Sequence, residues 1–322
     1  MPARRTLLAA VALAPLAAAR AQDAYPSRPI RIVLAYPPGG STDVLARVLA
    51  ARLQELWAGS SVVVENKPGG GAIVGTQTVA NATPDGYTLA LGNNQTHASN
   101  QWMAPSLPYH VLDSFTPVTK LAVVHHALVV PANHPAKTLA ELIARGKNGG
   151  KLTYASSSVG SASHVIAETF ARRFGLDATH VPYRGGGPAT TDTIAGVVDF
   201  FVSTWPQVVT LVKDGKLRAL EVGAAARLPE APDVPTAAEA GAPFMAVDAW
   251  FGLWAPAGTP KPIVDKLGAA FVAMLAEPAI IGRLQQAGFT PDPQGPDAFA
   301  AFQKAEVARW KELADTTGIR ME

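Results

Sequence analysis

The feature of this sequence that most restricts its fold is a repeated order of apolar run, glycine-rich turn and segment with helical periodicity. In the first repeat, residues 29–36 are followed by the turn 37–40 and by an apolar stripe of helical spacing across residues 44–57. Strands that alternate with helices form mostly parallel sheets with helices on both faces. The sequence therefore predicts an α/β fold with mostly parallel sheets.

The same order recurs in two series along the chain. The first continues with predicted strands at 61–65 and 87–92 around a helix at 72–81. The second starts near residue 137 and alternates in the same way, with helices at 138–145, 163–174 and 188–195 and strands at 152–155, 179–182, 197–202 and 217–222. Each series is long enough for its own lobe, and 322 residues suit two lobes better than one.

Two segments are predicted to link the lobes, and two crossing strands would form a hinge. The candidates are residues 121–130 and 247–255. Three C-terminal segments that begin at or near a proline are predicted as helices returning to the first lobe: 262–275, 278–287 and 296–315. The predicted division is 22–122 for the first part of lobe 1, 123–247 for lobe 2 and 248–322 for the return to lobe 1.

Residues 1–21 have the pattern of a removable export signal. Arg4 and Arg5 precede an apolar run at residues 7–19, and residues 19–21 fit the small-x-small cleavage pattern. The run is too short to span about 30 Å of hydrocarbon as a helix. The two arginines also partly resemble a twin-arginine signal, which leaves the export route open. The mature chain is predicted to be soluble and periplasmic.

Composition excludes several classes of function. The chain has no cysteine, which rules out a disulfide scaffold, a thiolate metal site, a cysteine nucleophile and a lipid anchor on an N-terminal cysteine. The net charge is +2 and the basic residues do not cluster, so no nucleic-acid partner is predicted. The seven histidines are scattered, and the adjacent His125 and His126 point to opposite faces of a strand. No metal and no cofactor is predicted.

Four loops that directly follow predicted strands are the candidate sites: 37–43, 93–97, 156–163 and 183–187. A glycine-rich turn that leads into a helix presents unpaired N–H groups and the positive end of the helix dipole, so it binds an anion without a basic side chain. The alternative for loop 37–43 is a tight turn with a helix cap, and for loop 156–163 a solvated loop with an N-cap serine.

Loop 156–163 holds five serines around Gly160, and hydroxyl groups bind a carboxylate through charge-assisted hydrogen bonds. Nucleotide-binding P-loops, nucleophile elbows and zinc-binding helices are absent as motifs. One enzyme alternative is a hydrolase in which His164 activates Ser157 or Ser161. No carboxylate stands at a recognisable position to orient that histidine, so no catalytic residue is assigned.

Ten short motifs occur in one order along nearly the whole predicted mature chain. They include YPSRPIR at 25–31, PPGGSTD at 37–43, VENKPGGG at 64–71, VPYRGG at 181–186 and WAPAGTP at 254–260. In this order the motifs resemble the Bug, or TctC-type, periplasmic solute receptors of tripartite tricarboxylate transporters. Two positions depart from the family pattern: Arg184 stands where lysine is common, and the stretch after Asp199 lacks the usual acidic residue.

The resemblance implies a two-lobed periplasmic-binding-protein fold, the Venus flytrap, which closes on a small carboxylate. The ligand would be held by backbone amides, hydroxyl groups and bridging waters. Carried over by position, the implied ligand-binding residues are Pro38, Gly39, Gly40, Ser41, Thr42, Asp43, Asn93, Thr96, Ser156, Ser157, Ser158, Gly160, Ser161, His164, Tyr183, Arg184, Gly185 and Asp199.

The resemblance further implies a non-catalytic receptor that delivers its ligand to membrane permease subunits. The implied ligand is a small organic carboxylate: a di- or tricarboxylate, an acidic amino acid or an aromatic acid. The protein is expected to be a monomer that diffuses freely in the periplasm. A sensor that presents its closed form to a signalling protein is an alternative with the same binding site.

Overall fold

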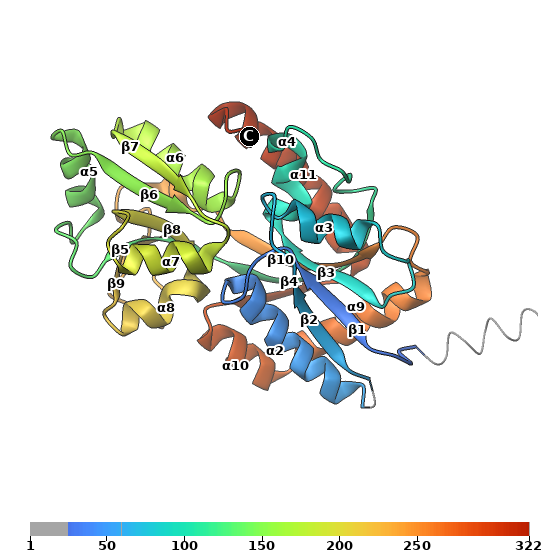
Figure 1. The fold of residues 1–322 in the computed structure, drawn as a ribbon. Coiled ribbons are helices and arrows are strands. Elements are labelled where there is room, and N and C mark those ends of the chain that lie inside the picture. The colour runs from blue at the N-terminus through green and yellow to red at the C-terminus, as the bar shows by residue number, and fades with distance from the viewer. Residues whose placement is uncertain (1–24, 59, 322) are drawn as a thin grey trace, which may run out of the picture.

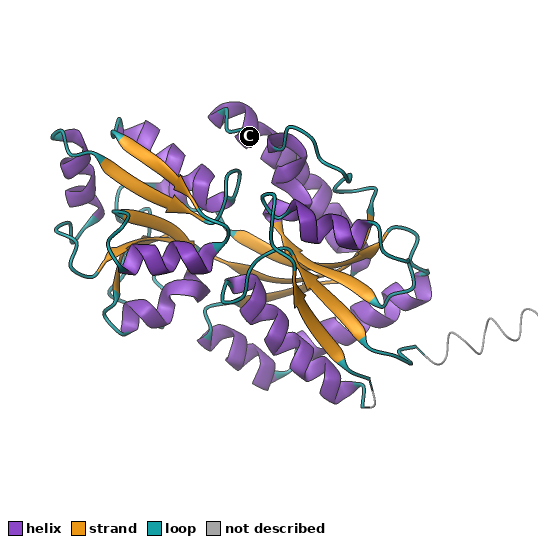
Figure 2. Ribbon diagram, in the orientation of Figure 1, coloured by secondary structure: helices purple, strands orange, loops and turns teal. Residues whose placement is uncertain are grey.

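The computed structural model describes residues 25–58 and 60–321. Two lobes stand side by side (Figure 1), with lobe 2 in green and yellow and lobe 1 combining the blue N-terminal part with the red C-terminal helices. Each lobe is a β-sheet covered by helices on both faces (Figure 2), which confirms the predicted two-lobed α/β fold. The predicted export signal at residues 1–21 lies outside the described residues.

The sheet of lobe 1 has six strands in the order β11-β4-β10-β3-β1-β2. In chain order they are β1 (Ile30–Leu34), β2 (Val62–Asn66), β3 (Thr88–Asn93), β4 (Phe115–Val124), β10 (Ala249–Pro256) and β11 (Thr290–Gln294). β1 is parallel to β2 and β3, whereas β10 is antiparallel to both β3 and β4, and β11 is antiparallel to β4.

The sheet of lobe 2 has five strands in the order β7-β6-β8-β5-β9. They are β5 (His126–Pro131), β6 (Leu152–Ser156), β7 (Ala178–Pro182), β8 (Phe200–Thr204) and β9 (Leu217–Val222). β6 is parallel to β7 and β8, but β5 is antiparallel to β8 and β9. Both sheets are thus mixed, and the prediction of mostly parallel sheets is wrong for the strands that enter or re-enter a lobe. These strands do not arise from strand–helix–strand repeats and run against them.

Helices pack on both faces of each sheet. Lobe 1 carries α2 (Ser41–Leu56), α3 (Ile73–Ala80), the π-helical turn η1 (Gln95–Ser99), α4 (Asn100–Met103), α9 (Lys261–Leu275), α10 (Pro278–Gln286) and α11 (Pro296–Thr317). Lobe 2 carries α5 (Leu139–Lys147), α6 (Ala162–Phe174), α7 (Gly186–Ile194), α8 (Trp205–Lys213) and the 3₁₀ turn η2 (Pro243–Met245). The three C-terminal helices pack on the lobe 1 sheet, since α9 and α11 contact β4 and α10 contacts β11.

Among the residues that the structure describes, no single helix has the length and apolar character to cross a membrane; α9 and α10 pass that test only as a pair bent by 73°. Both helices contribute buried side chains to the apolar core of lobe 1, among them Leu267, Phe271 and Leu284. Their apolar character is therefore used in packing against the sheet.

The two connections between the lobes lie next to each other. β4 and β5 are separated by one residue, His125, and the return passes through Val247 and Asp248 before β10 begins. His125 Nδ1 lies 2.7 Å from Asp248 Oδ1, and His126 Nδ1 lies 2.7 Å from the carbonyl oxygen of Val247. Most of the predicted second crossing, 247–255, is a strand of the lobe 1 sheet. The boundaries between the lobes at 122–123 and 247–248 stay predictions.

Direct hydrogen bonds join the lobes on the side where the predicted loops meet. Ser41 Oγ lies 2.5 Å from Thr204 Oγ1, and Gln95 Nε2 donates to Ser158 Oγ at 2.6 Å. Farther along the seam, Arg172 on α6 donates to the carbonyl oxygen of Thr317 at the end of α11, 2.9 Å away. The lobes are therefore in contact, which is the closed arrangement of a two-lobed protein.

Candidate functional site

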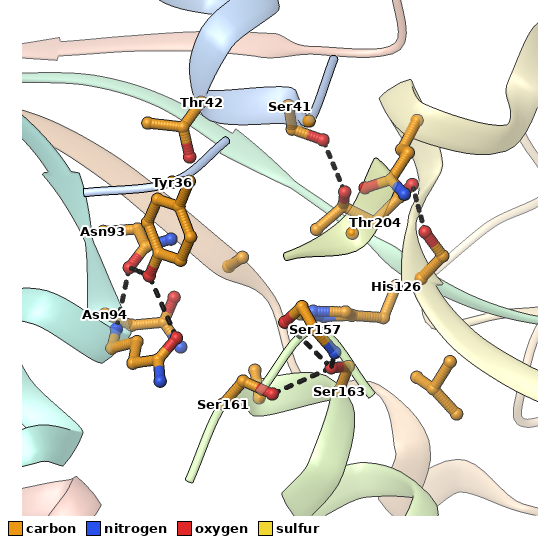
Figure 3. Close-up of a pocket in the computed structure, with 18 of the residues that line it drawn as sticks. Tyr36, Ser41, Thr42, Asn93, Asn94, His126, Ser157, Ser161, Ser163 and Thr204 are labelled. Atoms are coloured by element: carbon orange, nitrogen blue, oxygen red, sulfur yellow. Dashed lines mark hydrogen bonds between the residues drawn. The ribbon is translucent and has the colours of Figure 1, made fainter. Parts of the chain in front are cut away.

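A cavity of about 70 Å³ lies between the lobes. Figure 3 shows side chains from both lobes pointing into it, with Tyr36, Thr42 and Asn93 on one side and His126, Ser157 and Thr204 on the other. The remaining lining residues are Pro37, Gly40, Ser41, Asn94, Gln95, Ser161, Ala162, Ser163, Gly186, Phe201, Val202, Ser203, Gln207, Ala249 and Phe251.

Four helices begin at this cavity. Gly40, Ser161 and Thr204 are the N-cap residues of α2, α6 and α8 and line the cavity, as does Gly186, the first residue of α7. Of these four helices, α6 alone has a side-chain cap, in which Ser161 Oγ accepts from the backbone N–H of His164. The positive ends of four helix dipoles thus converge on one space, which favours an anion there.

None of the described residues that line the cavity carries a formal charge at neutral pH. The lining supplies hydroxyl groups, side-chain amides and backbone N–H groups, and its single titratable side chain with an ordinary pKa near neutrality is His126. Neutral donors bind an ionised acceptor more strongly than a neutral one. The lining therefore offers neutral hydrogen-bond donors to a negatively charged group.

His126 is neutral in this environment. Burial lowers the pKa of the imidazole to about 4, although the hydrogen bond to the Val247 carbonyl opposes the shift. Because a carbonyl only accepts, Nδ1 carries the proton and Nε2 is left as an acceptor. The ring extends toward Ser157 (Figure 3), so Nε2 offers an acceptor to a ligand hydroxyl or a water molecule.

Asp43 holds the turn 37–40 in place from beneath the cavity. Its carboxylate accepts from the Gly39 N–H at 3.2 Å, from Arg47 at 2.8 and 3.0 Å, and from Asn66 at 3.1 Å. Burial raises the pKa of this carboxyl, but the hydrogen bonds from Arg47, Gly39 and Asn66 outweigh burial and lower it. Asp43 is thus ionised and fully engaged, and does not line the cavity.

The segment after β3 forms a network of amides instead of an open loop. Asn93 Oδ1 accepts from the Gln95 N–H at 3.0 Å and from Tyr36 OH at 2.9 Å. Thr96 Oγ1 is buried and lies 2.8 Å from His97 Nδ1. Asn93 and Gln95 therefore face the cavity, whereas Thr96 stabilises the turn from within.

The serine loop divides in the same way. Ser157 and Ser161 line the cavity, and Ser163 accepts from the Ser157 N–H at 3.0 Å. Ser156 is fully buried, and its Oγ lies 2.6 Å from His180 Nε2. The His164 ring stacks on His180 with centroids 3.8 Å apart. Ser156, His164 and His180 thus form a layer behind the loop.

Six predicted ligand-binding residues line the cavity: Gly40, Ser41, Thr42, Asn93, Ser157 and Ser161. Four others line a second hollow beside it: Ser158, Tyr183, Arg184 and Gly185. Eight line neither, namely Pro38, Gly39, Asp43, Thr96, Ser156, Gly160, His164 and Asp199. Asp199 precedes β8 and its carboxylate accepts from Thr153 N at 2.7 Å, whereas Thr204 at the other end of β8 lines the cavity. Ligand binding by Asp199 stays a prediction.

Glycine turns in the sequence do not mark several of the residues that line the cavity. Thr204 and Gln207 follow β8, where a strand leads into a helix without any glycine. Ligands of open α/β sheets bind beyond the carboxyl ends of the strands, and both residues stand at this position. Tyr36, Gln95 and His126 also line the cavity, and His126 stands at a crossing, which sequence alone does not distinguish from a core position.

The hydrolase alternative requires the His164 ring to pair with Ser157 or Ser161, and no hydrogen bond among the described residues joins His164 Nδ1 or Nε2 to either hydroxyl. His164 Nδ1 accepts from the Gly160 N–H at 3.2 Å, and Ser161 Oγ donates to the Ser158 carbonyl at 2.7 Å. The one close pair, Ser156 with His180, is buried behind the loop. Within residues 25–58 and 60–321, no group of three or more metal-ligating side chains is positioned to hold a metal ion.

Comparison with known proteins agrees with this architecture. A family model described as "Tripartite tricarboxylate transporter family receptor" matches residues 45–319. The chain belongs to this family. BugT of Bordetella pertussis is 36% identical over 314 residues, which cover 97% of this chain and 96% of BugT. The family resemblance found in the sequence motifs is thereby confirmed.

Solved structures of similar proteins have the same fold. Rpa4515 of R. palustris, determined with adipate, superposes with a TM-score of 0.87 at 34% identity, covering 92% of this chain and 99% of that one. MatC from Rhodopseudomonas palustris, with bound malate, gives a TM-score of 0.84 at 34% identity, covering 90% of this chain and 99% of that one. A third similar structure, BugD, is described as a periplasmic binding protein. The predicted periplasmic-binding-protein fold is confirmed.

Proposed function

We propose that this protein is a periplasmic receptor that captures a small organic carboxylate between its lobes and delivers it to a membrane transporter. The observation that carries the proposal is the convergence of four helix N-termini on a cavity whose described lining residues bear no charge. Helix ends and hydroxyl groups stabilise a carboxylate without a basic side chain. Structures of relatives with adipate and malate support this ligand class.

The lining residues come from both lobes, which explains how the protein would capture a ligand. Gly40, Ser41 and Thr42 come from lobe 1, while Ser157, Ser161 and Thr204 come from lobe 2, so a carboxylate in the cavity contacts both lobes only when they are closed. A ligand shifts a conformational equilibrium by its difference in affinity for the two states. A preference of about 5.5 kcal/mol would take the closed form from about 1% to about 99% of the population.

The proposal includes the steps before and after binding. The export signal at residues 1–21 would direct the chain to the periplasm as a soluble monomer, and the closed form would be read by permease subunits. The family's description as a transporter receptor supports delivery to a membrane transporter. The same site would serve a sensor, but no feature of the cavity favours that function. Binding alone performs the function, and no catalytic step is proposed.

Calorimetric titration of protein freed of ligand by unfolding and refolding tests the proposal. The titrants are monocarboxylates, dicarboxylates including adipate and malate, aromatic acids and acidic amino acids, each beside its neutral amide. At least one acid is expected to bind with its amide showing no measurable affinity, because the helix ends stabilise charge. Absence of binding by every acid, or equal binding of acid and amide, would contradict the receptor function.

A further inference from the structure

A second hollow of about 350 Å³ adjoins the cavity, and Tyr36, Pro37 and Ser157 form walls of both. Its other walls come from the two lobes: Ala35 and residues 68–71 from lobe 1, and Ser158 with residues 183–185 from lobe 2. Like the cavity, it therefore takes its shape only when the lobes close.

The cavity alone is small. About 70 Å³ corresponds to roughly two water molecules at their volume in the liquid. That is enough for one carboxylate and a short part of a carbon chain, but a chain with a carboxylate at each end needs more room. The hollow is the space next to the cavity into which such a chain would extend.

The two spaces differ in charge. Among the described residues that line either space, Arg184 is the single formally charged side chain at neutral pH. Its guanidinium forms no ion pair with any described carboxylate, unlike Arg172 on α6, which pairs with Glu168. The cavity thus has neutral donors for one anionic group, and the hollow has one cation that pairs with no described carboxylate.

The backbone fixes the position of Arg184 at the seam. On either side of it, the Tyr183 N–H donates to the Ser156 carbonyl at 3.0 Å and the Gly185 N–H donates to the Ser157 carbonyl at 2.8 Å. Gly185 has a φ of +124° and packs so closely on Pro37 of lobe 1 that an added Cβ would lie 2.6 Å from Pro37 Cγ. The residue between these anchors is therefore held at the mouth of the hollow.

We propose that the hollow is a second subsite in which Arg184 pairs with the far carboxylate of a linear dicarboxylate whose first carboxylate lies in the cavity. This inference rests on the proposed function and narrows it to dicarboxylates. A guanidinium matches a carboxylate with two parallel hydrogen bonds, which lysine does not provide.

The test compares each α,ω-dicarboxylate with its monoamide, which has the same length but one charge fewer. Both are titrated into the wild-type protein and into the variants Arg184→Gln, Arg184→Lys and Arg145→Gln. Arg145 is an exposed arginine on α5 that lines neither space, so its variant controls for the change in net charge.

The wild-type protein is expected to prefer the dicarboxylate by about two- to fivefold, the range of a solvent-screened ion pair. Arg184→Gln should remove this preference and leave monoamide affinity nearly unchanged, Arg184→Lys should keep part of it, and Arg145→Gln should keep all of it. Equal weakening of both ligands by Arg184→Gln, or an unchanged preference, would overturn the second subsite. If no acid binds to the wild-type protein, the proposed function itself fails.

Discussion

Replacement of Gly40 by valine is expected to abolish most ligand binding while the protein stays folded. Gly40 is the N-cap of α2 with φ −84° and ψ 170°, an extended conformation that valine adopts readily, and an added Cβ meets no atom within 4 Å. The empty space around it is the cavity, where a valine side chain would block approach to the first-turn N–H groups of α2. Affinity should fall by at least about 30-fold, or about 2 kcal/mol.

Gly295 provides a matched control for this variant. It is the N-cap of α11 with φ −63° and ψ 172°, and an added Cβ there also meets nothing within 4 Å. Gly295→Val lies outside the cavity lining and should bind ligand like the wild-type protein. Thermal unfolding of both variants checks that they are folded, and calorimetry measures affinity. Unchanged affinity in a folded Gly40→Val protein would remove α2 from the binding site.

Replacement of Glu221 by glutamine is expected to stabilise the protein at neutral pH. Glu221 on β9 is 1% exposed, its Oε1 accepts from the Leu128 N–H at 2.8 Å, and its Oε2 has no partner among the described residues. Burial raises the pKa of this carboxyl to about 8, although the hydrogen bond from Leu128 opposes the shift. The group is therefore protonated in the folded protein at pH 7, and glutamine resembles that form.

The sign of the pH dependence follows from the two states. Between the unfolded pKa near 4.3 and the folded pKa near 8, the unfolded chain has lost a proton that the folded chain keeps, so folding stability falls as pH rises through this window and levels off above it. Glu221→Gln should remove this loss in the free energy of unfolding, which amounts to about 3 kcal/mol at pH 7.

Denaturant unfolding of the wild-type protein and of Glu221→Gln at pH 5, 7 and 9 measures this difference. The gap in unfolding free energy should widen from pH 5 to pH 7. Glu312→Gln, an exposed substitution on α11, removes the same charge without burial and should show no such widening. A gap that stays constant across the three pH values would mean that Glu221 is ionised in the folded protein.

The sequence was sufficient to predict the fold class, because the alternation of strand and helix is a local pattern. The C-terminal return and the choice of loops were also inferred from local patterns, namely prolines at helix starts and glycine turns after strands. Parallel pairing was predicted too widely, because the direction of β5 and β10 depends on how the chain passes between lobes. No local pattern records that path.

The candidate site was predicted at the level of loops and less well at the level of side chains. Asp43 and Ser156 belong to predicted loops, yet they turn inward to Arg47 and His180. Which way a polar residue points within a loop depends partly on partners that the fold brings next to it, such as Asn66 for Asp43 and His180 for Ser156. Thr204 was not among the predicted residues, because no glycine marks the junction between β8 and α8. Like the predicted loops, this junction follows a strand.

The central claim is that a carboxylate lies between the lobes and is held by helix ends and hydroxyl groups. A crystal structure of the refolded protein with its tightest-binding acid tests this claim most directly. We expect carboxylate oxygens within hydrogen-bonding distance of the first turn of α2 and of Ser157 or Ser161, directly or through water, with both lobes in contact. A ligand bound outside the cavity, or held there by one lobe alone, would contradict it.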